Sequence, residues 1–155
     1  QKMAELRSGM FWGLNFPIYI LRCYNLQVFT SEKHMKNPVG YFEVPVVDLD
    51  QAILFYEAIF GYSLERVSID GNEMALFPFD EMASGITGAL AQGESYIPSK
   101  LGSRVYFNVS EIDSILEKVI SLGGKVLYPK TSIGELGWVA EFEDTEGNCI
   151  ALHSQ

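Results

Sequence analysis

The sequence is poor in cysteine, in histidine and in positive charge, and each shortage excludes a class of protein. The two cysteines, Cys23 and Cys149, form no CxxC pair, which excludes a zinc cluster and a secreted disulfide scaffold. We therefore expect a reduced, cytoplasmic setting. The sequence also contains no GxSxG elbow, phosphate-binding loop, dinucleotide-binding fingerprint or HExxH helix, so it offers none of the common catalytic signatures.

Positive charge is scarce and unevenly distributed. Residues 1–36 hold five Lys or Arg and two acidic residues, whereas residues 37–155 hold six and eighteen, a net charge of −12 in the second region. Such a region repels phosphate backbones, so nucleic acid is not an expected partner. The uncharged run from Ser8 to Leu21 spans fourteen residues. A membrane-spanning helix needs about 20 apolar residues, so we expect no membrane segment and interpret residues 1–36 as an N-terminal extension.

The remainder of the chain contains an internal repeat. Its apolar content is that of a packed globular protein, because 48% of all residues are hydrophobic. Two amphipathic helical patterns are each followed by a glycine, and these glycines, Gly61 and Gly123, lie 62 residues apart. Val47 and Val109, which end the strand before each helix, have the same spacing. Two independent positions thus indicate a duplicated module of roughly sixty residues.

Each predicted helix is followed by three predicted strands. Asp48 with Gln51 and Ser110 with Asp113 are typical helix starts, and Asp70-Gly71 is a strong hairpin signal. The fold class is therefore α+β, with two tandem βαβββ modules, 38–93 and 101–155, within a domain of residues 37–155. The predicted strands after the helices are 63–69, 72–79 and 85–92 in the first module, and 124–131, 136–143 and 149–153 in the second.

Four short segments carry a resemblance to a known family. They are Tyr41–Asp50, Phe55-Tyr56, Phe60-Gly61 and Glu143–Asn148. The chain resembles the vicinal-oxygen-chelate superfamily (glyoxalase, bleomycin resistance protein and dioxygenase) over about residues 38–155. The resemblance implies curved mixed sheets around a cleft that holds a small-molecule ligand.

The resemblance also implies where a metal would be held. In metal-dependent members a ligand lies on the first strand of each module and another near the end of its last strand. Here these positions carry Tyr41, Ala89, Arg104 and Ala151. A divalent ion needs His, Glu, Asp or Gln at such positions, so we predict neither a metal nor another cofactor.

A displaced metal site is the alternative. Glu43 and His153 each lie two residues beyond a metal position, and residues two apart in a strand face the same way. A divalent ion held there would make the protein a metal-dependent lyase, isomerase or dioxygenase. Without a metal, Glu43 is a candidate general base and His153 a candidate for proton transfer. A structural ion pair of Glu43 with Arg104, and an inert surface histidine, are the competing interpretations.

The cleft expected from the resemblance also has candidate ligand-binding residues. Arg104 suits an anionic ligand because its planar guanidinium grips a carboxylate or phosphate at two points. Tyr41, Phe77, Tyr106 and Trp138 are candidates for an aromatic lining, although aromatic residues in strands more often pack in a core.

The leading hypothesis is a metal-independent member that binds a small anionic or aromatic molecule in the inter-module cleft. A sequestering protein that protects by binding, as bleomycin-resistance members do, is a further alternative. A homodimer is expected for such a protein.

Overall fold

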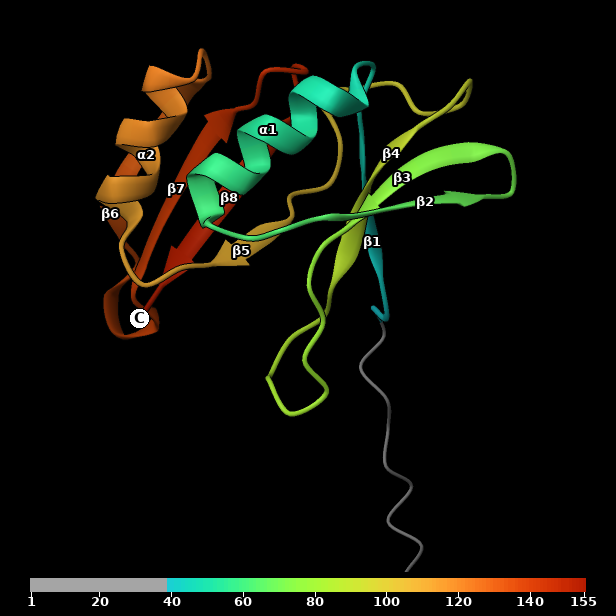
Figure 1. Ribbon diagram of the computed structural model, residues 1–155. Coiled ribbons are helices and arrows are strands. Elements are labelled where there is room, and N and C mark those ends of the chain that lie inside the picture. Colours follow the sequence, from blue (N-terminus) through green and yellow to red (C-terminus); the bar gives the residue numbers. More distant parts are fainter. Residues whose placement is uncertain (1–38) are drawn as a thin grey trace, which may run out of the picture. The chain divides into compact units, whose positions relative to one another are not determined.

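The computed structural model describes residues 39–155, and the predicted N-terminal extension lies outside the described residues. Figure 1 shows the two modules in chain order. The first module comprises β1 (Phe42–Pro45), α1 (Leu49–Phe60), β2 (Glu65–Ile69), β3 (Asn72–Leu76) and β4 (Gly88–Gln92). The second comprises β5 (Tyr106–Asn108), α2 (Ile112–Ser121), β6 (Lys125–Ser132), a 3₁₀ turn η1 (Gly134–Leu136), β7 (Trp138–Glu143) and β8 (Cys149–Ser154).

Each module forms one four-stranded mixed sheet. The strand order is β1-β4-β3-β2 in the first sheet and β5-β8-β7-β6 in the second. The first strand of each module pairs in parallel with the last, and the other pairs are antiparallel. The predicted α+β fold of two tandem βαβββ modules is confirmed. In the described part of the chain no helix is long and apolar enough to cross a membrane.

The local signals of the first module act as predicted. The Asp48 carboxylate accepts a hydrogen bond from the backbone N–H of Gln51 at 3.0 Å, and Gly61 ends α1 with φ 74°. Asp70 and Gly71 join β2 to β3 with φ 51° and 77°, the conformation of a two-residue hairpin turn. Residues close together in the sequence therefore determine the ends of α1 and the turn of the β2–β3 hairpin.

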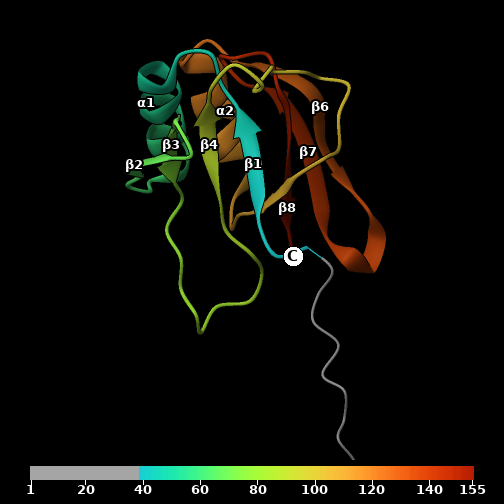
Figure 2. The same cartoon turned by 90° about the vertical axis from the view of Figure 1, so that its right-hand side faces the viewer.

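Several predicted strand boundaries differ from the structure by one to three residues, and one predicted helix cap is wrong. Helix α2 begins at Ile112 after Glu111, whose side chain makes no capping bond, so Ser110 does not cap it. Strand β3 ends at Leu76 rather than at residue 79, since Pro78 lacks the N–H that a ladder needs. Residues 77–87 therefore form a long loop, which extends beyond the strands in Figures 1 and 2. The Thr87 hydroxyl closes the loop on the carbonyls of Phe77 and Pro78, at 3.2 and 3.1 Å.

The helix-facing sides of the two sheets share one hydrophobic core. Residues from α1, α2 and both sheets belong to the same buried cluster. Phe42 of β1 meets Phe107 of β5 edge-on with ring centroids 5.5 Å apart, and Phe107 stacks on Phe60 of α1 at 4.7 Å. Because side chains alternate along a strand, the neighbours of Phe42 and Phe107 lie on the opposite faces of their sheets. We call these the outer faces.

A buried polar network joins the two modules. The Tyr56 hydroxyl of α1 donates to the Asp144 carboxylate at 2.7 Å, and the Asn148 amide donates to that carboxylate and to the carbonyl of Pro45. The Glu146 carboxylate accepts from the backbone N–H groups of Val47 and Asp48 at 2.6 and 3.0 Å. The turn 144–148 of the second module is thereby held on the start of α1.

We expect Tyr56→Phe to lower the free energy of unfolding by about 1–3 kcal/mol, since it removes one of the hydrogen bonds to the buried Asp144 carboxylate and leaves that charge with fewer partners. Urea unfolding measures the change. Tyr128→Phe is the matched control, because Tyr128 is exposed on β6 and should shift stability by no more than about 0.5 kcal/mol. Equal shifts in the two variants would contradict the network's role.

The same tyrosine predicts a loss of stability in alkali. Burial and the Asp144 carboxylate raise the pKa of Tyr56 well above its ordinary value of 10.0. The unfolded chain ionises this phenol near pH 10 and the folded chain does not, so the contribution of Tyr56 is complete below pH 10 and declines above it. Unfolding measured from pH 9 to 11 should show a steeper decline in wild type than in Tyr56→Phe, by up to about 1.4 kcal/mol per pH unit. Parallel curves would contradict this.

Candidate functional site

A pocket of about 610 Å³ lies between the loop 77–87 of the first module and strand β5 of the second. Three rings of the shared core form an apolar group on its wall. The ring centroids of Phe42, Phe77 and Phe107 are 5.4 to 5.8 Å apart. The residues that line this inter-module pocket are Val39, Phe42, Tyr62, Phe77–Asp80, Ala83–Thr87 and Arg104–Asn108.

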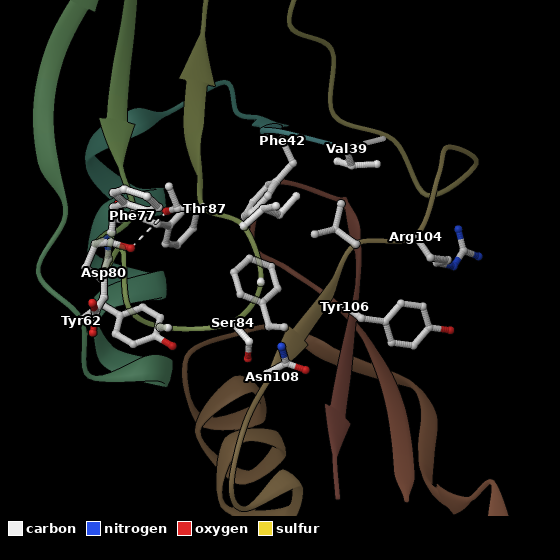
Figure 3. A pocket seen from close by; sticks show the side chains of 17 residues that line it. Val39, Phe42, Tyr62, Phe77, Asp80, Ser84, Thr87, Arg104, Tyr106 and Asn108 are labelled. Atoms are coloured by element: carbon white, nitrogen blue, oxygen red, sulfur yellow. Dashed lines mark hydrogen bonds between the residues drawn. The ribbon is translucent and has the colours of Figure 1, made fainter. Parts of the chain in front are cut away.

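Polar groups of the inter-module pocket come from both modules (Figure 3). Tyr62, Asp80 and Ser84 belong to the first module and Asn108 to the second. The Asp80 carboxylate accepts from the backbone N–H of Met82 at 2.9 Å, which shapes the loop. The pocket therefore combines an apolar wall with a few hydroxyl, amide and carboxylate groups.

Arg104 lines the inter-module pocket, but its guanidinium already has partners. Its Nε donates to Glu141 at 3.3 Å, and its Nη1 donates to the carbonyls of Lys100 and Gly102, each at 3.2 Å. Figure 3 shows the Arg104 and Tyr106 side chains directed away from Phe77 and Tyr62. Arg104 thus lies at the rim, and within residues 39–155 its carboxylate partner is Glu141 and not the predicted alternative, Glu43.

Among the predicted site residues, the structure brings Phe77, Arg104 and Tyr106 together around the inter-module pocket. Glu43 lies elsewhere, on the outer face of the first sheet beside Ala89. Its carboxylate accepts a hydrogen bond from the Tyr96 hydroxyl at 2.9 Å. Tyr41 directly precedes β1, and burial together with the Glu43 charge raises the pKa of its phenol.

Sequence reasoning missed Tyr96. It lies in the segment 93–100, which the sequence predicts to be only a connector between the two modules. The available signal was its position as the only aromatic residue between Gly93 and Lys100.

His153 lies on the outer face of the second sheet. Its Nε2 is 2.8 Å from the carbonyl oxygen of Leu136, and its Nδ1 is 3.4 Å from the Asn108 side-chain oxygen. Carbonyl oxygen only accepts, so Nε2 carries a proton. The ring is held between the β6–β7 connection and β5, and Asn108 links it to the edge of the inter-module pocket.

Trp138 takes the other side of the second sheet. It begins β7 and alternates in phase with the buried Ala140 and Phe142, so it lies on the side covered by α2. The ammonium of Lys130 is 5.5 Å from its ring centroid and pairs with Asp113 of α2 at 2.7 Å. Trp138 is therefore placed apart from the inter-module pocket and from Glu43.

A family model described as the Glyoxalase/Bleomycin resistance protein/Dioxygenase superfamily matches residues 39–152. The chain belongs to this superfamily. A glyoxylase-like domain-containing protein of Didymella fabae is 31% identical over 118 residues, which are 74% of this chain and 91% of that protein.

Solved structures of this superfamily share the fold at low identity. A glyoxalase I mutant from Zea mays is 19% identical with a TM-score of 0.55, over 76% of this chain and 46% of that one. The chain thus spans about half the length of the maize enzyme. A genomically encoded fosfomycin resistance protein from Listeria monocytogenes is 18% identical with a TM-score of 0.55, over 78% and 95% of the two chains.

The residues present do not fit the superfamily's metal. Its metal positions carry Tyr41, Ala89, Arg104 and Ala151, and both alanines are fully buried. Across residues 39–155 no three His, Cys, Asp or Glu side chains gather as a metal site would require. The scaffold is that of the superfamily, and its usual ligand set is missing.

Gly88 is expected to be essential for the wall of the inter-module pocket. A Cβ at this position would overlap the carbonyl oxygen of Phe42, because β4 passes close to β1 there. Gly88→Ala should lower stability by about 1–3 kcal/mol and displace the Phe42 ring. Gly40→Ala is the control, since a Cβ at Gly40 meets nothing within 4 Å. Thermal unfolding of the two variants tests this, and equal melting temperatures would contradict it.

Proposed function

We propose that the protein binds a small aromatic molecule with a polar or anionic substituent in the inter-module pocket, without a metal ion. The observation that carries the proposal is the group of Phe42, Phe77 and Phe107 beside a pocket of about 610 Å³. Ligand pockets of this size are lined mainly by apolar and aromatic groups, with a few polar groups that fix orientation. Tyr62 and Asn108 are such groups.

Arg104 is the residue that would favour an anionic substituent. It is the only Lys or Arg among the residues lining the inter-module pocket. An anion at the rim can replace one of the two carbonyl oxygens that Arg104 now contacts while the Glu141 pair persists. The aromatic body then supplies most of the affinity and Arg104 adds selectivity for negative charge.

Binding without chemistry is the role that these residues support best. Glu43 and His153 belong to two different sheets, and neither lines the inter-module pocket. A protein that captures a toxic aromatic molecule protects the cell by binding alone, and no catalytic group is needed for that. Proton transfer by Glu43 or His153, a homodimer and a cytoplasmic location remain predictions.

The pocket is tested with 8-anilinonaphthalene-1-sulfonate, an aromatic anion, by isothermal titration calorimetry. Ala83 lines the inter-module pocket, so Ala83→Trp should fill it and weaken binding at least tenfold. Met82 lies next to it, 93% exposed and outside the lining, so Met82→Trp should bind as wild type does. Equal affinities for wild type and Ala83→Trp would overturn the proposal.

The role of Arg104 is tested with a matched pair of probes. N-phenyl-1-naphthylamine is the same ring system without the sulfonate. Arg104→Met should weaken the sulfonate probe about five- to tenfold, because one charge-assisted contact at an exposed rim is lost. It should leave the neutral probe unchanged. An equal loss for both probes would mean that Arg104 acts on the shape of the pocket and not on charge.

A further inference from the structure

The inter-module pocket has one positive and one negative side chain in its lining, and they lie on opposite sides of it. Among residues 39–155, Arg104 is the only cation of the lining and Asp80 is its only carboxylate. Figure 3 shows Asp80 on the Phe77 side of the pocket and Arg104 at the opposite rim, with Phe42 between them. The pocket therefore has a negative end and a positive end, separated by aromatic rings.

The turn that Asp80 begins holds this residue in place. Its Oδ1 accepts from the backbone N–H of Met82 at 2.9 Å, and its carbonyl accepts from the backbone N–H of Ala83 at 3.1 Å. The Thr87 hydroxyl closes the base of the same loop through two further hydrogen bonds. The position of the Asp80 carboxylate is thus set by the loop itself, before any ligand binds.

The Asp80 carboxylate also has an oxygen to spare. Within residues 39–155 its hydrogen bond to the Met82 N–H engages only Oδ1, and none of the ion pairs there involves Asp80. An ionised carboxylate can accept about four hydrogen bonds on its two oxygens. Asp80 can therefore accept from a ligand through Oδ2 without giving up the bond that shapes its loop.

A tyrosine ring accompanies the carboxylate at the negative end. Figure 3 shows Tyr62 on the same side of the pocket as Asp80. The Tyr62 ring stacks on Phe60 of α1 with the ring centroids 5.5 Å apart, and this contact orients it. An aromatic face and a carboxylate both attract a cation, so together they favour an ammonium group over an uncharged substituent. This end of the pocket suits positive charge, as the Arg104 end suits negative charge.

We propose that the ligand of the inter-module pocket is an aromatic zwitterion, with its anionic group at Arg104 and an ammonium group at Asp80. This inference rests on the proposed function and adds a second charge to the ligand. The reverse orientation would set like charge against like charge at both ends, so the two side chains select one direction of the bound molecule. Aromatic molecules that carry only one of the two charges are the weaker ligands.

The test uses a set of naphthalene probes that share one ring system. The compound 5-(2-aminoethylamino)naphthalene-1-sulfonate carries both charges, its N-acetyl derivative carries only the sulfonate, and N-(1-naphthyl)ethylenediamine carries only the ammonium. In isothermal titration calorimetry the wild type should bind the doubly charged probe about threefold or more tightly than either of the others, the gain expected of one exposed ion pair. Ala83→Trp should weaken the binding of every probe, because it fills the pocket.

Asp80→Asn is the decisive variant, because it removes the charge, keeps the size and leaves an oxygen that can accept from the Met82 N–H. The preference for the doubly charged probe over its N-acetyl derivative should disappear in Asp80→Asn. Glu81→Gln is the matched control, since Glu81 is adjacent, exposed and outside the lining, and its preference should equal that of the wild type. Arg104→Met should weaken both sulfonate probes and keep the preference between them.

The outcomes separate this inference from the proposed function. The inference is overturned if the wild type shows no preference for the doubly charged probe, or if the preference survives Asp80→Asn. An equal loss of preference in Glu81→Gln also overturns it, because the general attraction of an acidic protein for cations then accounts for the effect. In each case the proposed function stands if the sulfonate probes still bind wild type more tightly than Ala83→Trp. Equal binding of those probes by Ala83→Trp contradicts the proposed function itself.

Discussion

The buried hydrogen bond between Tyr56 and Asp144 is the contact on which the arrangement of the two modules depends. Both groups are almost completely enclosed, and each would be costly to bury alone. Asn148 ties the same carboxylate to the end of β1. This network fixes which faces of the two sheets meet, because it holds the last turn of one module on the helix of the other. In the same arrangement Phe42 and Phe107 meet edge-on, and the inter-module pocket lies beside them.

The shared core has a consequence for chemistry. A strand can direct a given side chain either into the core or to the outer face, so the pocket wall and the outer face of the first sheet draw on alternate residues of β1. Phe42 serves the inter-module pocket and Glu43 the outer face. On β5, Phe107 packs in the shared core and Tyr106 is directed away from Phe77, although both line the pocket. The two residues predicted to transfer protons, Glu43 and His153, are thereby kept out of the lining of the inter-module pocket. This separation is the physical reason for assigning binding, rather than catalysis, to that pocket.

Local signals in the sequence were sufficient for the elements and for their order. Asp48, Gly61 and Asp70-Gly71 act through bonds to near neighbours, so their effects are visible in a short window. The alternation of side chains along a strand also separates its two faces, but it does not predict which face packs against another module. Trp138 and Arg104 show this limit: the α2 side of the sheet and the nearby Glu141 determine where they lie. Tyr96 was missed because a connector has no periodicity that would assign it to a surface.

The missing metal ligands and the seating of Tyr96 are sterically linked in the first module. The superfamily's metal position on β4 carries Ala89, which belongs to the buried cluster against which Tyr96 packs and is the register partner of Glu43. A histidine or glutamate at position 89 would extend from the outer face of the first sheet toward the Tyr96 ring. Such a residue would compete with Tyr96 for the surface of this cluster. In this module the position that holds a metal ligand in the superfamily is thus occupied by an alanine of the cluster against which the chain's own Tyr96 packs.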